Sequence, residues 1–157
     1  MATDQAKGTC FVIAPIGDDG SPERIRSDQV LKYIIEPVVD SIGYVALRAD
    51  QISKSGSITN QVIEHLIDDA LVIADLTGHN PNVFYELALR HAIRKPVVLI
   101  IEEGEDIPFD IKTERTIFFN HTDLASVDRC KNALTAQIKA VGSDPRDVDN
   151  PITLPWM

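Results

Sequence analysis

The chain has 157 residues, of which 44% are hydrophobic and 25% charged, as is typical of one globular domain. Its formal net charge of −9 argues against a nucleic-acid backbone as the main partner, because binding that backbone requires a basic face; we therefore expect no DNA or RNA partner. No apolar run is long enough to cross a bilayer, and the first residues, MATDQAKGT, lack the apolar core of a secretory signal. These features predict a cytoplasmic protein without a membrane partner.

Residues that commonly bind metals show no pattern typical of a metal site. Cys10 and Cys130 lie far apart without CxxC spacing, and we interpret them as buried thiols. The four histidines contain no HExxH or similar pair, and the glycine-rich GDDGS is neither a Walker A loop nor a GxGxxG motif. We therefore expect no metal and no resident cofactor.

The first apolar cluster and the segment after it have different periods. TCFVIAPIG, residues 9–17, is a short continuous apolar run closed by proline and glycine, which predicts a buried strand. Apolar residues at helical spacing then predict a helix over 21–43, with Ser21 as its N-cap and Pro22 at its first position. Pro37 is expected to kink this helix.

The rest of the chain continues the alternation between strand and helix periods. Asn80 and Pro81 repeat the pairing of a capping residue with a proline and predict another helix start. The further strands are predicted over 44–50, 70–75, 95–104 and 116–119, and the further helices over 57–70, 80–93 and 123–141.

Strands that alternate with helices form βαβ units, which build a parallel sheet covered on both faces. The chain is therefore expected to be an α/β protein, with a flavodoxin-like doubly wound sheet of about five mainly parallel strands. Residues 1–142 are predicted to form the single domain and residues 143–157 an irregular C-terminal tail. Ligands of such folds bind outside the carboxyl ends of the strands, near the point where the strand order reverses.

Polar residues and glycines collect after the first three predicted strands. If the strands are parallel, all of these residues share one edge of the sheet, although loops are commonly polar and about half of them are expected to be solvated or capping groups. Glycines let the backbone approach a ligand, and the helix that begins at Asn80 presents free N–H groups. The candidate substrate-binding residues are Pro15, Ile16, Gly17, Arg24, Asp50, Gly56, Thr77, Gly78, Asn80 and Asn82.

Glu86 and Asp75 are the candidate catalytic carboxylates. Glu86 lies four residues after Asn82, so both are on one face of a helix that starts at the expected ligand edge. The alternative for Glu86 is a surface ion pair with Arg90 at i,i+4 spacing. The alternative for Asp75 is a loop cap whose carboxylate accepts backbone N–H groups.

The segments FVIAPIG, GYVALRAD and SGSITNQVIEHLIDDALVIADLTGHNPNVFYELALRHAIRKPVVLI together resemble the nucleoside 2-deoxyribosyltransferase-like group, over roughly residues 9–120. That group includes bacterial TIR-like proteins associated with antiphage signalling. The resemblance implies a flavodoxin-like sheet and cleavage of an N-glycosidic bond. It places Glu86 at the position of the glutamate that attacks the anomeric carbon or releases nicotinamide from NAD. It places Asp75 at the position of an aspartate that holds sugar hydroxyls or the base.

Two main functional hypotheses follow. The first is an enzyme that acts on the N-glycosidic bond of NAD, a nucleoside or a nucleoside monophosphate, with NAD as substrate rather than cofactor. The second is a binding domain that senses a nucleotide in the same pocket without catalysis, and an assembly domain is a third possibility. A small-molecule nucleotide or nucleoside is the expected partner, and the chain is expected to form a homo-oligomer.

Overall fold

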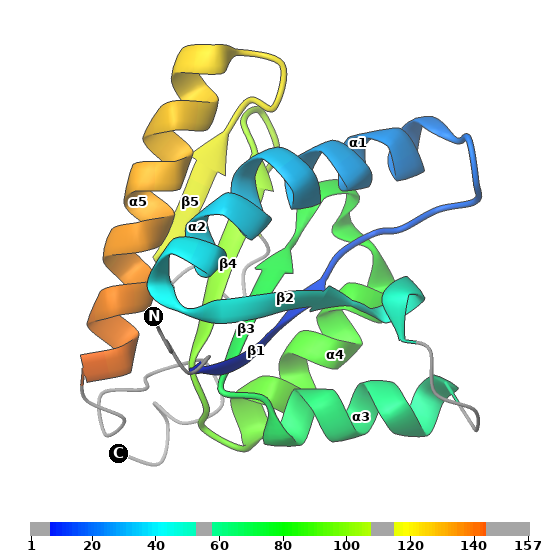
Figure 1. Cartoon of the computed structure of the whole chain (residues 1–157). Coiled ribbons are helices and arrows are strands. Elements are labelled where there is room, and N and C mark those ends of the chain that lie inside the picture. The colour runs from blue at the N-terminus through cyan, green and yellow to red at the C-terminus, as the bar shows by residue number, and fades with distance from the viewer. Residues whose placement is uncertain (1–6, 53–57, 108–114, 144–157) are drawn as a thin grey trace.

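A computed structural model describes residues 7–52, 58–107 and 115–143 of the chain. Five strands form one sheet in the order β2-β1-β3-β4-β5, and every neighbouring pair is parallel (Figure 1). This arrangement confirms the predicted flavodoxin-like α/β fold. Gly56 and the predicted tail, apart from Ser143 at the end of the last helix, lie outside the described residues.

The elements follow the predicted order. The strands are β1 (Gly8–Ile13), β2 (Tyr44–Arg48), β3 (Leu71–Asp75), β4 (Val97–Glu102) and β5 (Thr116–Phe119). The α-helices are α1 (Pro22–Val30), α2 (Glu36–Ile42), α3 (Ile58–Asp68), α4 (Pro81–Ala92) and α5 (Leu124–Ser143).

Side chains alternate between two cores along each strand, because successive residues of a strand point to opposite faces of the sheet. In β3, Ile73 packs against α1, α2 and α5, whereas Val72 and Ala74 pack against α3 and α4. Both faces are thereby covered, which explains why β3 is apolar at every position before its last residue (Figure 1). This alternation decides to which side of the sheet each functional side chain points.

The long helix predicted over 21–43 is divided into three parts. A π-helical turn over Leu31–Ile35 separates α1 from α2, and the N–H of Glu36 donates to the carbonyl of Leu31, five residues earlier. Pro37 explains the division, because its ring nitrogen has no hydrogen to donate and the ring crowds the preceding turn of an ordinary α-helix. The proline is thus accommodated by a π-helical turn that ends two residues before it.

The first two strands end earlier than predicted. β1 ends at Ile13, two residues before Pro15, which has no N–H for the ladder. β2 ends at Arg48, where a short 3₁₀ turn over Ala49–Gln51 begins. The loops that leave the carboxyl edge are correspondingly longer than expected.

Ser21 provides a test of the helix start that was predicted from sequence. Its hydroxyl accepts the N–H of Arg24 at 3.1 Å, as expected of an N-cap. We expect Ser21→Ala to lower the free energy of unfolding by about 1 kcal/mol. Urea unfolding followed by circular dichroism measures this change, with Ser21→Thr, which keeps the hydroxyl, as the control. An unchanged midpoint in the alanine variant would mean that solvent replaces the cap.

Candidate functional site

A cleft of about 560 Å³ opens at the carboxyl edge of the sheet. It lies beside the ends of β1 and β3, where the strand order reverses and where doubly wound folds bind ligands. The loop after β1, helix α3 and the first turns of α4 form its walls. The lining residues are Ala14, Ile16, Gly17, Thr59, Val62, Ile63, Leu66, Asn80, Asn82, Val83, Tyr85, Glu86 and Leu89.

Asn80 and the residues just before it position the α4 wall of the cleft. The side-chain oxygen of Asn80 accepts the N–H groups of Asn82 at 2.8 Å and Val83 at 3.4 Å, and Pro81 occupies the first helical position. Gly78 has φ +80°, a left-handed conformation that costs glycine little. The chain can therefore reverse directly after β3 and begin a helix at the mouth of the cleft.

Gly17 forms the opposite lip of the cleft, and its conformation requires glycine. Its φ is +72°, and a Cβ atom there would lie 2.7 Å from the hydroxyl oxygen of Ser21 and 3.0 Å from Cβ of Glu23. The turn after β1 can therefore pack tightly on the start of α1. Gly17 presents backbone rather than a side chain to the cleft.

Glu86 is half-buried in the cleft and forms no hydrogen bond or ion pair with any described residue. Burial without a compensating donor disfavours the charged form, and it raises the pKa of the Glu86 carboxyl to about 7. A carboxyl group with this pKa exchanges a proton near neutral pH. Such groups are characteristic of catalytic sites.

The alternative ion pair between Glu86 and Arg90 does not form. Arg90 is fully buried, with its guanidinium donating to the carbonyl of Leu66 at 2.9 Å and to that of Pro96 at 3.0 and 3.2 Å. Leu66 lies in the last turn of α3 and Pro96 directly precedes β4, so Arg90 joins the ends of both elements to α4. All three guanidinium nitrogens donate to structural carbonyls, and Glu86 has no counter-ion among the described residues.

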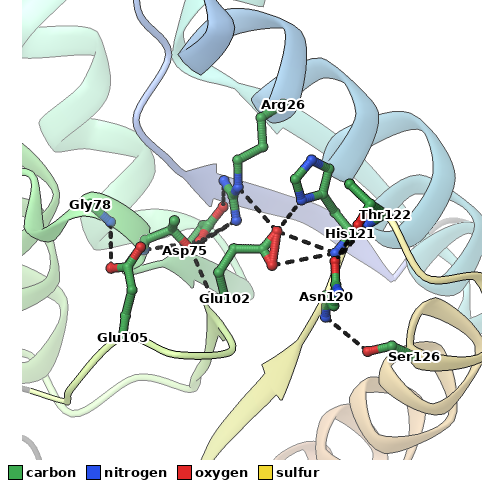
Figure 2. Close-up of polar contacts among 10 residues, drawn as sticks. Arg26, Asp75, Gly78, Glu102, Glu105, Asn120, His121, Thr122 and Ser126 are labelled. Atoms are coloured by element: carbon green, nitrogen blue, oxygen red, sulfur yellow. Dashed lines mark hydrogen bonds and ion pairs between the residues drawn. The ribbon is translucent and has the colours of Figure 1, made fainter.

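Asp75 lies on the other side of the sheet from the cleft. Ala74 faces the α3 and α4 core, so the fully buried Asp75 points toward α1 instead. Its carboxylate accepts bonds from Arg26 Nη1 at 2.8 Å and from the backbone N–H and hydroxyl of Thr77 at 3.1 and 2.7 Å (Figure 2). The structure therefore does not bring Asp75 together with Glu86, and the loop-cap alternative describes its contacts.

Arg24 and Asp50 belong to an ion-pair cluster outside the cleft lining. The guanidinium of Arg24 contacts Asp19, Asp28 and Asp50, at 2.9, 3.1 and 3.2 Å. Arg48 also pairs with Asp50, and its hydrogen bond holds the pKa of that carboxyl below its usual range. Neither residue offers an uncommitted group to the cleft.

The expected binding residues thus fall into three sets. Five of the candidate residues line one cleft: Ile16, Gly17, Asn80, Asn82 and Glu86. Six lie outside its lining: Pro15, Arg24, Asp50, Asp75, Thr77 and Gly78. Gly56 is not among the described residues.

The sequence analysis missed the α3 wall of the cleft. Val62, Ile63 and Leu66 share one side of the helix predicted over 57–70, and all three line the cleft, although Leu66 is also fully buried. Tyr85 lies at the rim with 65% of its surface exposed. The sequence signal for such a wall is an apolar helix face that is wider than the surface the packed neighbouring elements cover.

The described residues also lack two other kinds of feature. No group of three or more histidine, cysteine, aspartate or glutamate side chains in these ranges is arranged to hold a metal ion. Among the described helices, none combines the length and apolar character that a bilayer crossing requires.

Comparison with known proteins finds no matching family model and no matching sequence among curated proteins. Solved structures do match. A 2-deoxyribosyltransferase from Bacillus psychrosaccharolyticus superposes with a TM-score of 0.54 at 17% identity, over 76% of this chain and 95% of that one. The chain has the 2-deoxyribosyltransferase fold. A CMP N-glycosidase from Clostridium botulinum has a TM-score of 0.48 at 16% identity, covering 77% and 96% of the two chains.

The raised pKa of the Glu86 carboxyl can be tested by measuring the stability of the protein, without any assay of activity. The Glu86 carboxyl has a pKa of about 7 in the folded protein and its ordinary 4.5 in the unfolded chain. The unfolded state therefore ionises first, and stability falls as the pH rises from about 4.5 through 7. We expect Glu86→Gln to raise the free energy of unfolding by about 2 kcal/mol at pH 8 and by less than about 1 kcal/mol at pH 5.

Urea unfolding at the two pH values measures this difference. Glu64→Gln is the matched control, because Glu64 is an exposed glutamate on the neighbouring helix α3. An equal effect of Glu86→Gln at both pH values would show that the carboxyl titrates normally.

Proposed function

We propose that this protein cleaves the N-glycosidic bond of a nucleotide-type substrate, such as NAD or a nucleoside monophosphate, by hydrolysis or by transfer. Glu86 is the nucleophile, or it stabilises the oxocarbenium-like transition state. The observation that carries the proposal is a half-buried carboxyl, without a partner among the described residues, in a cleft at the reversal point of the sheet. The fold shared with a 2-deoxyribosyltransferase supports the same reaction class.

The proposed reaction passes through a positively charged sugar. As the bond from the anomeric carbon to the base nitrogen breaks, its electron pair leaves with the base and positive charge develops on the sugar. A carboxylate beside that carbon stabilises this charge or bonds to the carbon. Water then completes hydrolysis by attacking the anomeric carbon: any bond from this carbon to Glu86 breaks and regenerates the carboxylate, and the proton of the water passes to the departed base or to solvent. In transfer, a nitrogen of a second base attacks instead and releases the carboxylate in the same way.

The ionisation of Glu86 gives the proposal a pH dependence. A nucleophilic or charge-stabilising carboxyl must be deprotonated, and half of the free enzyme meets this condition near pH 7. A positive charge that develops within the cleft favours the ionised form further. The absence of a competing cation around Glu86, among the described residues, leaves its charge available to the substrate.

The chemistry of the walls suits a nucleoside. Val62 and Ile63 of α3 and Leu89 of α4 provide an apolar surface for a planar base, while Asn80 and Asn82 at the start of α4 provide amide groups for sugar hydroxyls. No arginine or lysine is among the described residues that line the cleft. The cleft therefore fits the nucleoside part of the substrate, and phosphate groups would extend beyond the described lining.

A nucleotide-sensing domain without catalysis is the second candidate. It is favoured by the placement of Asp75, because the cleft has no second carboxylate among its described lining residues to hold the sugar for in-line attack. In either form, a role in antiphage signalling is proposed from the sequence resemblance to the TIR-like proteins alone.

The direct test incubates the purified protein with NAD, nucleosides and nucleoside monophosphates, and measures released base by chromatography. We expect base release from at least one of these compounds. We expect Glu86→Gln to reduce this release by about 10²–10³-fold, because the developing charge loses its stabilising carboxylate. Glu64→Gln should retain full activity. Turnover that persists in Glu86→Gln would exclude Glu86 as the catalytic carboxylate.

The same assay separates the two candidates. Thermal stabilisation by one compound, without base release from any, would favour the sensing domain over the enzyme.

A pH profile tests the ionisation state that the proposed mechanism requires. We expect kcat/KM to rise with pH and to level off above an apparent pKa of about 7, because only the ionised Glu86 is active. Initial rates at low substrate concentration, from pH 5 to 9, measure this profile. A rate that falls through the same range would instead assign Glu86 as a proton donor to the leaving base.

A further inference from the structure

The face of the sheet opposite the cleft carries a connected polar network centred on Arg26 (Figure 2). Arg26 is on α1, is largely buried, and reaches the loop that follows β3. From this network we propose that Arg26 is a positioning residue: acting through Asp75 and Thr77, it holds the loop that places Asn80 and Asn82 at the cleft. The kinetic part of this proposal rests on the proposed function, whereas the structural part does not.

Arg26 makes two different contacts with the loop. Its Nη1 donates to the carboxylate of Asp75 at 2.8 Å, and its Nη2 donates to the hydroxyl of Thr77 at 2.8 Å. A planar guanidinium can hold both groups at once, which a single ammonium group cannot do with the same geometry. The first contact neutralises a buried charge, and the second orients the loop.

The Thr77 hydroxyl is the point where three elements meet. It donates to the Asp75 carboxylate at 2.7 Å and accepts from Arg26 Nη2 and from the N–H of Glu102, at 2.8 and 3.0 Å. One donation and two acceptances are the full capacity of a hydroxyl group. Thr77 thereby joins the end of β3 to α1 and to the end of β4.

The guanidinium of Arg26 is itself held on further sides. It lies 5.7 Å from the ring centre of Phe119, and its Nε lies 3.4 Å from a carboxylate oxygen of Glu102. That carboxylate in turn contacts the imidazole and the backbone N–H of His121 (Figure 2). These contacts restrict the rotamers of Arg26, so the loop is attached to a rigid group.

The loop is attached again on its far side before it reaches the cleft. The N–H of Gly78 donates to the carboxylate of Glu105 at 2.7 Å, and the ring of His79 contacts the carbonyl of Asp106 at 2.7 Å. The next residue, Asn80, caps α4 and lines the cleft. Without Arg26, the segment between Thr77 and the cap would depend on these two solvent-exposed contacts and would loosen, while Val83 and Leu87 would keep the body of α4 packed.

A simpler role for Arg26 is neutralisation of Asp75 alone. Arg26→Lys separates the two roles, because lysine keeps a positive charge opposite Asp75 but loses the second, oriented contact with Thr77. Thr77→Val also separates them, since it removes the hydroxyl with little change of shape and leaves Arg26 beside Asp75. Thr77→Ser keeps the hydroxyl and is the conservative rescue variant.

Amide hydrogen exchange of the ligand-free protein, measured by NMR, decides the structural part. We expect Arg26→Lys and Thr77→Val to speed exchange of the amides at position 77, Asn82 and Val83 by about tenfold or more, since each variant loses at least one hydrogen bond that holds the loop. Exchange in β3 should stay unchanged, and Thr77→Ser should restore the wild-type rates. Arg24→Lys, which alters a different ion pair of α1, should leave these three amides unaffected.

Two outcomes of the exchange experiment would overturn the proposal. Unchanged rates at Asn82 and Val83 in both variants would limit Arg26 to neutralising Asp75. An equal increase at the loop and throughout β3 would show a loss of global stability, not a loss of positioning.

Steady-state kinetics test the consequence for the cleft, using whichever nucleoside or nucleotide the wild-type protein cleaves. We expect Arg26→Lys to raise KM by about tenfold and to change kcat by less than about threefold, since the Asn80 and Asn82 wall moves while Glu86 stays on the packed helix. Equal KM values with a lower kcat would contradict this role. A wild-type protein without turnover would refute the proposed function but leave the exchange result, and hence the positioning role, intact.

Discussion

The buried pair of Asp75 and Arg26 is the contact on which the carboxyl edge of the sheet depends. An isolated charge at the fully buried position of Asp75 would be strongly unfavourable, so the carboxylate requires Arg26 and the donors of Thr77. Meeting that requirement ties α1, β3 and β4 together at one point. The loop after β3 starts at this point and carries Asn80, the cap of α4. The position of one cleft wall therefore depends on an ion pair on the opposite face of the sheet.

The two buried arginines have the same consequence for the cleft. Arg90 and Arg26 each donate to structural acceptors, and neither pairs with Glu86. No described residue compensates the burial of the Glu86 carboxyl, and its pKa is raised to about 7 for that reason. The Glu86 carboxyl destabilises the fold when it is ionised, and it lies in the cleft at the carboxyl edge. This combination is expected of a group that serves function and not stability.

Local sequence signals predicted most of the fold because their physical causes are local. Ser21 and Asn80 each precede a proline and supply a side-chain acceptor, and both begin helices as expected. The continuous apolar run before Asp75 required a strand covered on both faces, which led to the parallel sheet. The division of the first helix was less visible, since Pro37 indicates a kink but not the π-helical turn that accommodates it.

For the site, the sequence by itself determined that Ile16, Gly17, Asn80, Asn82 and Glu86 would gather at one edge, because parallel strands bring their carboxyl ends together. Only the tertiary structure decided which face each side chain would use. Ala74 faces the core under α3 and α4, so the next residue, Asp75, points to the other face of the sheet, away from the cleft. Which of the two residues faces the cleft depends on which helices cover each face of the sheet. The tertiary structure likewise decided the partners of Arg90. These are the carbonyls of Leu66 and Pro96, which come next to α4 only when α3, β4 and α4 pack together.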